Sequence, residues 1–144
     1  MDIKHQLQLN ATTQQVYEAI ATQQGIEGWW SQVCHISSNV GELSFMKFVK
    51  EDRVVGMYFR IDELQTDKKV AWTCVQNGNP AWTNSKLTFE IEKTGNGCSL
   101  IFIHSNFDDK WKGTPPYTIT AEGWNFFMNS LKSFCETGKG QPWG

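Results

Sequence analysis

The sequence predicts an α+β domain in which a strongly curved antiparallel sheet of about six or seven strands wraps around a long C-terminal helix. Three observations lead to this expectation. Two short helical segments follow the first strand, residues 33–105 alternate with a period of two between turn signals, and an apolar stripe of about three helical turns occupies residues 124–135. Only the last helix is left to cover one face of such a sheet.

The first part of the chain is expected to form a strand and two short helices. The apolar residues of segment 3–9 lie at mostly even spacing, which is typical of a strand with one buried face. Thr12 and Gln15 have the spacing of a capping box, which favours a helix start at this point. Gly25 is expected to end this helix, and a second helical turn should follow it.

The central part of the chain is predicted to be an antiparallel meander. Segment 86–92 alternates between apolar and polar residues, so one of its faces should be wet. Segment 98–105 is apolar at nearly every position and is expected to be a central strand buried on both faces, whereas the facing of segment 54–64 is left open. The turn signals that divide the strands lie at residues 37–41, 50–52, 66–68, 76–80 and 94–97.

The end of the chain is expected to contain a loop and the long helix. Two prolines and a glycine predict a loop over residues 108–116. Thr118 is the expected N-cap of the helix, and Gly138 is expected to take the left-handed conformation after its last turn. The tail GKGQPWG is expected to be loosely ordered.

Composition limits the function classes. A chain of 144 residues with 40% hydrophobic residues is expected to fold as a single domain over residues 1–144. The net charge of −2 without a basic stripe disfavours nucleic acid, and the absence of any run of about 18 apolar residues disfavours a membrane span. Four widely spaced cysteines without a CxxC pair predict free thiols and no metal site. The N-terminal segment MDIKHQLQLN lacks an apolar core, so a cytoplasmic protein is expected. No glycine-rich nucleotide motif occurs, and no cofactor is expected.

Four stretches with the pattern of core positions cover nearly the whole chain: VYEAIATQQGIEGWW, VAWTC, SKLTFEIEKTGNGCSLIFIHSNF and GWNFFMNSLKSFCETGKGQP. In them the chain resembles the START-like, or SRPBCC, superfamily, whose fold is called the helix grip. It is most similar to the branch named for the activator of the ninety-kilodalton heat-shock chaperone's ATPase. Asn106 departs from the family pattern, which has glycine there.

The resemblance implies a deep pocket between the sheet and the C-terminal helix. It also implies relatives that bind lipids, sterols or polyketide-like aromatics, relatives that catalyse cyclisation or hydrolysis, and a few members that contact the chaperone. A shared fold does not assign any of these activities to this chain.

Aromatic residues are unusually frequent, with seven tryptophans in the chain. Such rings either fill a core or line a pocket. One helical stripe should not bury both Trp29 and Trp30, so one of them is expected at the pocket mouth or against a neighbour. Trp82 and Trp111 fall in predicted loops and are expected to border the pocket entrance as exposed rings. The candidate ligand-binding residues are Trp30, Phe59, Trp72, Trp82, Phe102, His104, Trp111, Trp124, Phe127, Met128 and Leu131.

His104 is the one weak catalytic candidate. Strand parity points it inward with Leu100 and Phe102. It could be a hydrogen-bonded core histidine, a polar anchor for a ligand, or a general acid or base. Catalysis would require an orienting carboxylate, and alternation does not place Asp108 or Asp109 against the ring. No serine or cysteine nucleophile motif accompanies it.

Three functions follow from these observations. The leading hypothesis is a non-enzymatic domain that binds an apolar or aromatic small molecule, lipid-like or polyketide-like, between the sheet and the C-terminal helix. The first alternative is a cyclase or hydrolase that uses the same pocket, with His104 as proton shuttle. The second is an interaction domain that acts on a chaperone. A protein partner or a homodimer through an exposed face is also compatible with the sequence.

Overall fold

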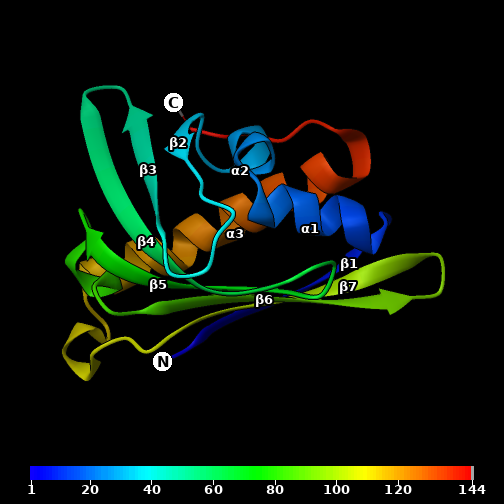
Figure 1. The fold of residues 1–144 in the computed structure, drawn as a ribbon. Coiled ribbons are helices and arrows are strands. Elements are labelled where there is room, and N and C mark those ends of the chain that lie inside the picture. The colour runs from blue at the N-terminus through cyan, green and yellow to red at the C-terminus, as the bar shows by residue number, and fades with distance from the viewer. Residues whose placement is uncertain (144) are drawn as a thin grey trace.

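The computed structural model describes residues 1–143, and these form the predicted α+β fold with a curved seven-stranded antiparallel sheet in the order β1-β7-β6-β5-β4-β3-β2 (Figure 1). The strands are β1 (Ile3–Leu9), β2 (Val33–His35), β3 (Leu43–Lys50), β4 (Arg53–Gln65), β5 (Lys69–Asn77), β6 (Lys86–Thr94) and β7 (Gly97–Ser105). The helices are α1 (Thr13–Ala21), α2 (Gln23–Trp29) and α3 (Pro115–Thr137), with 3₁₀ turns η1 (Pro80–Trp82) and η2 (Asp109–Trp111).

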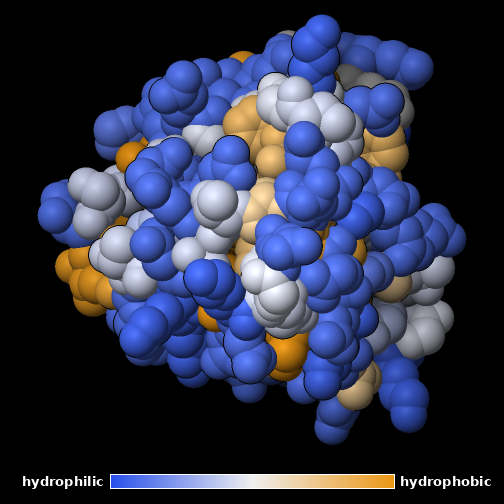
Figure 2. All heavy atoms as spheres, turned by 90° about the vertical axis from the view of Figure 1, so that its right-hand side faces the viewer, coloured by the Kyte–Doolittle hydropathy of each residue, from blue (hydrophilic) through white to orange (hydrophobic). Residues whose placement is uncertain are grey.

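All three helices lie on the same side of the sheet, and the β3–β4 hairpin curls up beside α3 (Figure 1). This arrangement leaves the opposite face of the sheet without a helix. On the side of the molecule shown in Figure 2, hydrophobic atoms are interspersed among hydrophilic ones. Large core rings meet between the sheet and the helices, where Trp124 of α3 contacts Phe102 of β7 and Trp30.

Strand β7 is paired on both edges, with β1 and with β6, but it is not buried on both faces as the sequence predicted. Cys98, Leu100 and Phe102 point toward the helices and are fully buried. Ile101 and Ile103 point to the opposite face and are only half-buried, because no helix in residues 1–143 covers that face. Apolar composition alone did not distinguish these two environments.

The predicted capping box is present, but the predicted helix end is wrong. The Gln15 amide donates to Thr12 Oγ1 at 3.1 Å, and the Thr12 amide donates to Gln15 Oε1 at 2.9 Å. Helix α1 ends before Thr22, and Gly25 lies inside α2. A Cβ at Gly25 would lie 2.1 Å from the Glu18 carbonyl oxygen. Glycine is needed here because the two helices approach closely, not because the chain turns.

Helix α3 begins earlier than predicted. Thr114, not Thr118, occupies the N-cap position, and prolines follow at the first positions of the helix. Proline is tolerated there because the amides of the first turn have no partner within the helix. The predicted loop over residues 108–116 is therefore shorter and contains η2. Gly138 has φ 84°, which confirms the predicted left-handed C-cap.

The C-terminal tail packs on the domain, so the prediction of a loosely ordered tail is wrong through residue 143; Gly144 lies outside the described residues. The Trp143 amide donates to the Trp30 carbonyl oxygen at 3.1 Å, and the Gln32 amide donates to the Trp143 carbonyl oxygen at 2.9 Å. A Cβ at Gly140 would lie 2.5 Å from the Gly28 carbonyl oxygen. These contacts hold the tail against α2.

The backbone conformation at position 106 explains why asparagine can stand where the family pattern has glycine. Its φ is 64°, in the left-handed region that asparagine tolerates better than most residues. Its side-chain amide donates to the Asn84 carbonyl oxygen at 2.9 Å, which fixes the exit of β7 against the loop before β6.

Candidate functional site

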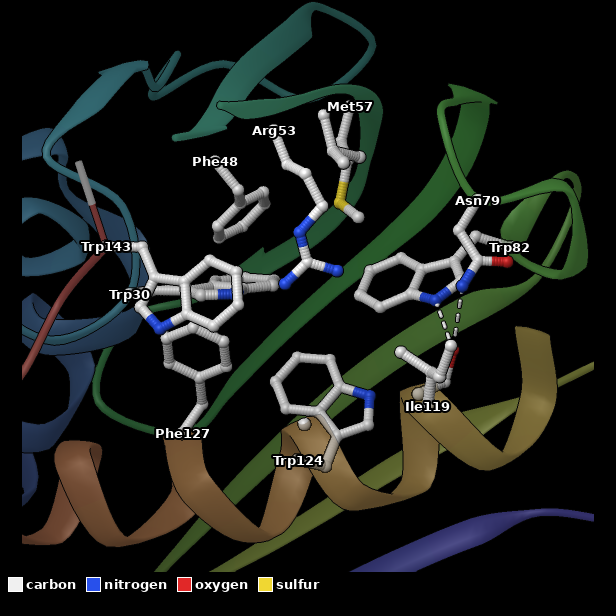
Figure 3. Close-up of a pocket in the computed structure, with 13 residues that line it drawn as sticks. Trp30, Phe48, Arg53, Met57, Asn79, Trp82, Ile119, Trp124, Phe127 and Trp143 are labelled. Carbon is white, nitrogen blue, oxygen red and sulfur yellow. Dashed lines mark hydrogen bonds between the residues drawn. The ribbon is translucent and has the colours of Figure 1, made fainter. Parts of the chain in front are cut away.

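A pocket of about 190 Å³ opens between the β3–β4 hairpin, η1 and α3 (Figure 3). Six of its thirteen lining residues are aromatic, and the Arg53 side chain extends from the hairpin toward its centre. The lining residues are Trp30, Phe48, Arg53, Val55, Met57, Asn79, Trp82, Ile119, Thr120, Gly123, Trp124, Phe127 and Trp143. The pocket lies where the hairpin curls away from α3, so backbone curvature creates the opening.

Trp30 forms the inner wall of the pocket. Its ring is 1% exposed and stacks on Trp72, with 6.3 Å between ring centroids and 7° between planes. It also contacts the rings of Trp124 and Phe127, with centroid distances of 5.1 and 6.5 Å. A ring held on several sides has little freedom to move, so this wall is preorganised.

Both Trp29 and Trp30 are buried, and only Trp30 lines the pocket, in agreement with the expectation that one helical stripe would not bury both rings. Helix α2 ends at Trp29, and Trp30 follows as its C-cap, so the two rings do not depend on the same stripe. The Trp29 indole N–H donates to the Ala19 carbonyl oxygen at 2.7 Å. The rings stack on each other with a centroid distance of 5.2 Å.

Trp82 is buried rather than exposed, which corrects the sequence prediction. It lies in η1, is 6% exposed, and stacks on Trp124 with a centroid distance of 5.7 Å and an interplanar angle of 21°. Its indole N–H donates to Thr120 Oγ1 at 2.7 Å, as Figure 3 shows. The loop that carries Trp82 is thus fastened to α3.

Asn79 and Thr120 complete this polar connection between η1 and α3. The Asn79 side-chain amide donates to the Pro116 carbonyl oxygen at 3.1 Å and to Thr120 Oγ1 at 3.3 Å. Thr120 Oγ1 in turn donates to the Pro116 carbonyl oxygen at 2.8 Å. These bonds close one side of the pocket and hold the first turns of α3 in place.

His104 lies behind the pocket in a hydrogen-bonded chain. Trp124 Nε1 donates to His104 Nδ1 at 3.0 Å, and because an indole nitrogen only donates, Nδ1 must be unprotonated. Nε2 therefore carries the proton and donates to Ser85 Oγ at 2.7 Å, and Ser85 Oγ donates to the Trp82 carbonyl oxygen at 2.5 Å. In this series of hydrogen bonds, from the Trp124 indole through His104 to Ser85, each donor meets an acceptor.

Burial determines the protonation of His104. The side chain is fully buried, and desolvation lowers the pKa of His104 to about 3. Both ring nitrogens are engaged, and His104 is not among the residues that line the pocket. The arrangement matches the hydrogen-bonded core histidine and argues against a proton shuttle, which needs a pKa near the working pH and access to a substrate.

The structure brings some predicted site residues together and separates others. Trp30, Trp82, Trp124 and Phe127 line the pocket. The other residues predicted for the site are buried in the core and do not line the pocket: Phe59, Trp72, Phe102, His104, Met128 and Leu131. Trp111 is half-buried on η2, where Lys110 Nζ lies 5.2 Å from its ring centroid, and it does not border the pocket.

Several lining residues were missed from the sequence. Arg53, Val55 and Met57 belong to the strand whose facing was left open. Ile119 and Gly123 lie in the first turns of α3, before the apolar stripe that predicted the helix face. Alternation along β4 would have put residues 53, 55 and 57 on one face, and this was the available signal.

The cysteines do not supply a nucleophile. All four are free, as predicted. Burial raises the pKa of Cys74 and of Cys135 to about 12 and that of Cys34 to about 11, so these thiols stay protonated near neutral pH. Across residues 1–143, no group of three metal-ligating side chains lies close enough together to hold an ion.

Comparison with known sequences gives a family match. The profile of the family described as activator of Hsp90 ATPase homolog 1-like protein matches residues 10–136. No curated protein matches the chain significantly. None of the helices in the described part of the chain is long and apolar enough to cross a membrane.

Solved structures with the same fold are numerous. The solution structure of the Aha1 dimer from Colwellia psychrerythraea is 27% identical, with a TM-score of 0.79, and the match covers 97% of this chain and 99% of that one. A protein from Staphylococcus saprophyticus is 20% identical, with a TM-score of 0.76 over 98% and 96% of the two chains. The AHSA1-like protein from Aeromonas hydrophila is 10% identical, with a TM-score of 0.73 over 93% and 91%.

We expect His104 to make stability depend on pH. The unfolded chain binds a proton at His104 below about pH 6.5, whereas the folded protein excludes it down to a pKa of about 3. The free energy of unfolding should therefore fall as pH decreases through this window, by about 2 kcal/mol between pH 7 and pH 5. His104→Gln should lack this loss in urea unfolding measured at both pH values.

His35→Gln is the matched control, because His35 is exposed on β2. This variant should keep the parent's pH dependence. An equal loss of stability in His104→Gln and in the parent would contradict the buried neutral histidine.

Proposed function

Because the chain belongs to the AHSA1-like family within the SRPBCC helix-grip superfamily, we propose that it binds a small apolar molecule in the pocket between the β3–β4 hairpin, η1 and α3. The observation that carries this proposal is the apolar lining of the pocket, which is rich in aromatic rings. Many large rings meet there, yet they leave about 190 Å³ unfilled. A concave surface lined mainly by apolar and aromatic side chains is the usual setting of a small-molecule site.

The volume limits the size of the ligand. An apolar cavity of about 150 Å³ is enough for benzene, and pockets for drug-sized ligands measure about 300–1,000 Å³. A pocket of about 190 Å³ suits one aromatic ring with a short chain. A sterol or a fused polyketide would need the hairpin to move away from α3, so the lipid-like and polyketide-like ligands expected from the sequence are narrowed to smaller molecules.

The expected affinity follows from the apolar surface that such a ligand buries. About 150 Å² of buried apolar surface stabilises a complex by at most about 4 kcal/mol, which corresponds to a dissociation constant of about 1 mM. Tighter binding would require a polar contact in addition to the apolar wall. The pocket should therefore be tested with concentrated, soluble single-ring compounds.

The other two functions have less support. The proton-shuttle mechanism depends on His104, which is neutral, fully bonded and outside the pocket lining. A role on a chaperone is suggested by the family description and by the Aha1 name of the Colwellia protein. No feature of the described residues points to a chaperone contact, whereas the pocket is a defined site.

We expect the neutral probe 3-phenylpropanamide to bind in the pocket with a dissociation constant of about 1 mM. In ¹H–¹⁵N NMR titrations the indole N–H signals of Trp30, Trp82 and Trp124 should shift because their rings line the site. The signal of Trp111 should stay unchanged. Absence of saturable shifts, or equal shifts at Trp111, would contradict the proposal.

A pair of valine variants separates the pocket from the rest of the surface. Val55 lines the pocket, whereas Val75 is 39% exposed and lies outside it. Val55→Trp should fill the space and weaken binding of 3-phenylpropanamide at least about tenfold, a loss of about 1.4 kcal/mol. Val75→Trp should bind as the parent does, provided that both variants unfold at similar temperatures.

A homodimer is a second proposal. The Colwellia protein is described as a dimer, and this chain is 27% identical to it over almost its full length. Val33, Val40 and Leu43 are 42%, 60% and 52% exposed around the edge strand β2, which supports an apolar contact there. Sedimentation equilibrium should give about twice the chain mass of 16.5 kDa. A monomer mass at about 100 μM protein would contradict this proposal.

A further inference from the structure

Most polar groups that line the pocket are already bonded within the protein. The indole N–H of Trp82 and the side-chain amide of Asn79 both donate to Thr120 Oγ1, which donates to the Pro116 carbonyl oxygen. The indole N–H of Trp124 donates to His104 Nδ1. These groups have no spare donor for a ligand and serve the architecture of the wall.

Two lining donors differ from this pattern. The Arg53 guanidinium forms no ion pair and no side-chain hydrogen bond with any residue that the structure describes, although Glu51 and Asp52 lie in the adjoining turn. The indole N–H of Trp30, a residue that is 1% exposed, also has no acceptor among the described residues. Both residues line the same pocket. The pocket therefore presents two hydrogen-bond donors, the Arg53 guanidinium and the Trp30 indole N–H, for which the described residues supply no acceptor.

A second arginine on the same strand, Arg60, has a carboxylate partner and serves as a comparison. Arg60 Nε donates to Asp62 Oδ1 at 3.0 Å, and Arg60 does not line the pocket. Arg53 instead extends between the rings of Trp143 and Trp82 in Figure 3, toward the centre of the cavity. A cation held at an apolar opening without a counter-charge favours an anionic ligand group at that point.

We infer that the ligand is a small monocarboxylic acid whose apolar body contacts the aromatic wall and whose carboxylate is bound by the Arg53 guanidinium where this group extends into the pocket. This inference rests on the proposed function, because it assigns the ligand class for the same pocket. A guanidinium presents two parallel N–H donors that match the two oxygens of a carboxylate. Arg53 itself is exposed, so the carboxylate stays partly hydrated and avoids the large cost of burying a charge.

The experiment compares two probes of nearly equal shape at pH 7, the anion 3-phenylpropanoate and its neutral amide 3-phenylpropanamide. Dissociation constants are measured by NMR titration of the indole signals. In the parent protein the acid should bind about tenfold tighter than the amide, since a hydrogen bond to a charged group is stronger than a neutral one. Arg53→Met should remove this preference, because the acid and the amide then meet the same uncharged side chain.

Arg60→Met is the matched control, because it removes an exposed arginine of the same strand that is already paired with Asp62. It should retain the tenfold preference for the acid. Equal binding of acid and amide by the parent, or a preference that persists in Arg53→Met, would overturn the assignment of the ligand class while the pocket remains. Failure of both probes to bind the parent would overturn the proposed function and this inference with it.

Discussion

The packing of Trp124 onto the concave face of the sheet is the interaction on which the rest of the structure depends. Its ring contacts Phe102 from β7 and Trp82 from η1, with centroid distances of 4.3 and 5.7 Å, and its N–H is bonded to His104. A single side chain thus fixes helix α3 against both the sheet and the loop before β6. Leaving a buried indole or imidazole without a hydrogen-bond partner would cost free energy. The hydrogen bonds from Trp124 through His104 to Ser85 therefore also fix the distance between α3 and the sheet.

This constraint explains why a pocket remains. The helix is held at Trp124, while the β3–β4 hairpin curls away from it (Figure 1). The side chains of Trp30, Trp82 and Phe127 are immobilised by their own ring contacts and cannot move across to fill the opening. Trp143 closes part of the opening from the tail, packing on Phe127 with a centroid distance of 5.7 Å. The pocket is thus a consequence of rigid rings on a curved sheet.

The fold could be predicted from local pattern, and the pocket could be predicted only in part. Periodicity and the Thr12 capping box depend on neighbours in the sequence, and both were confirmed. Trp82 was placed on an exposed loop because its partner, Thr120, lies 38 residues away. Arg53 was missed because the facing of its strand was left open, although alternation along β4 puts it on one face with Val55 and Met57. Trp143 was left out because a glycine-rich tail gives no sign of its backbone bonds to Trp30 and Gln32. Contacts between residues far apart in the sequence leave no periodic signal.

The central claim is that the rings line an apolar pocket that the protein's own side chains do not fill. A crystal structure of the protein under xenon pressure tests it most directly, because xenon enters apolar cavities without needing a polar contact. The account predicts a xenon atom in the pocket, against the rings of Trp30, Trp82 and Trp124. A structure without xenon, in which the rings of Trp30, Trp82 and Trp124 have closed onto one another and leave no space, would contradict it.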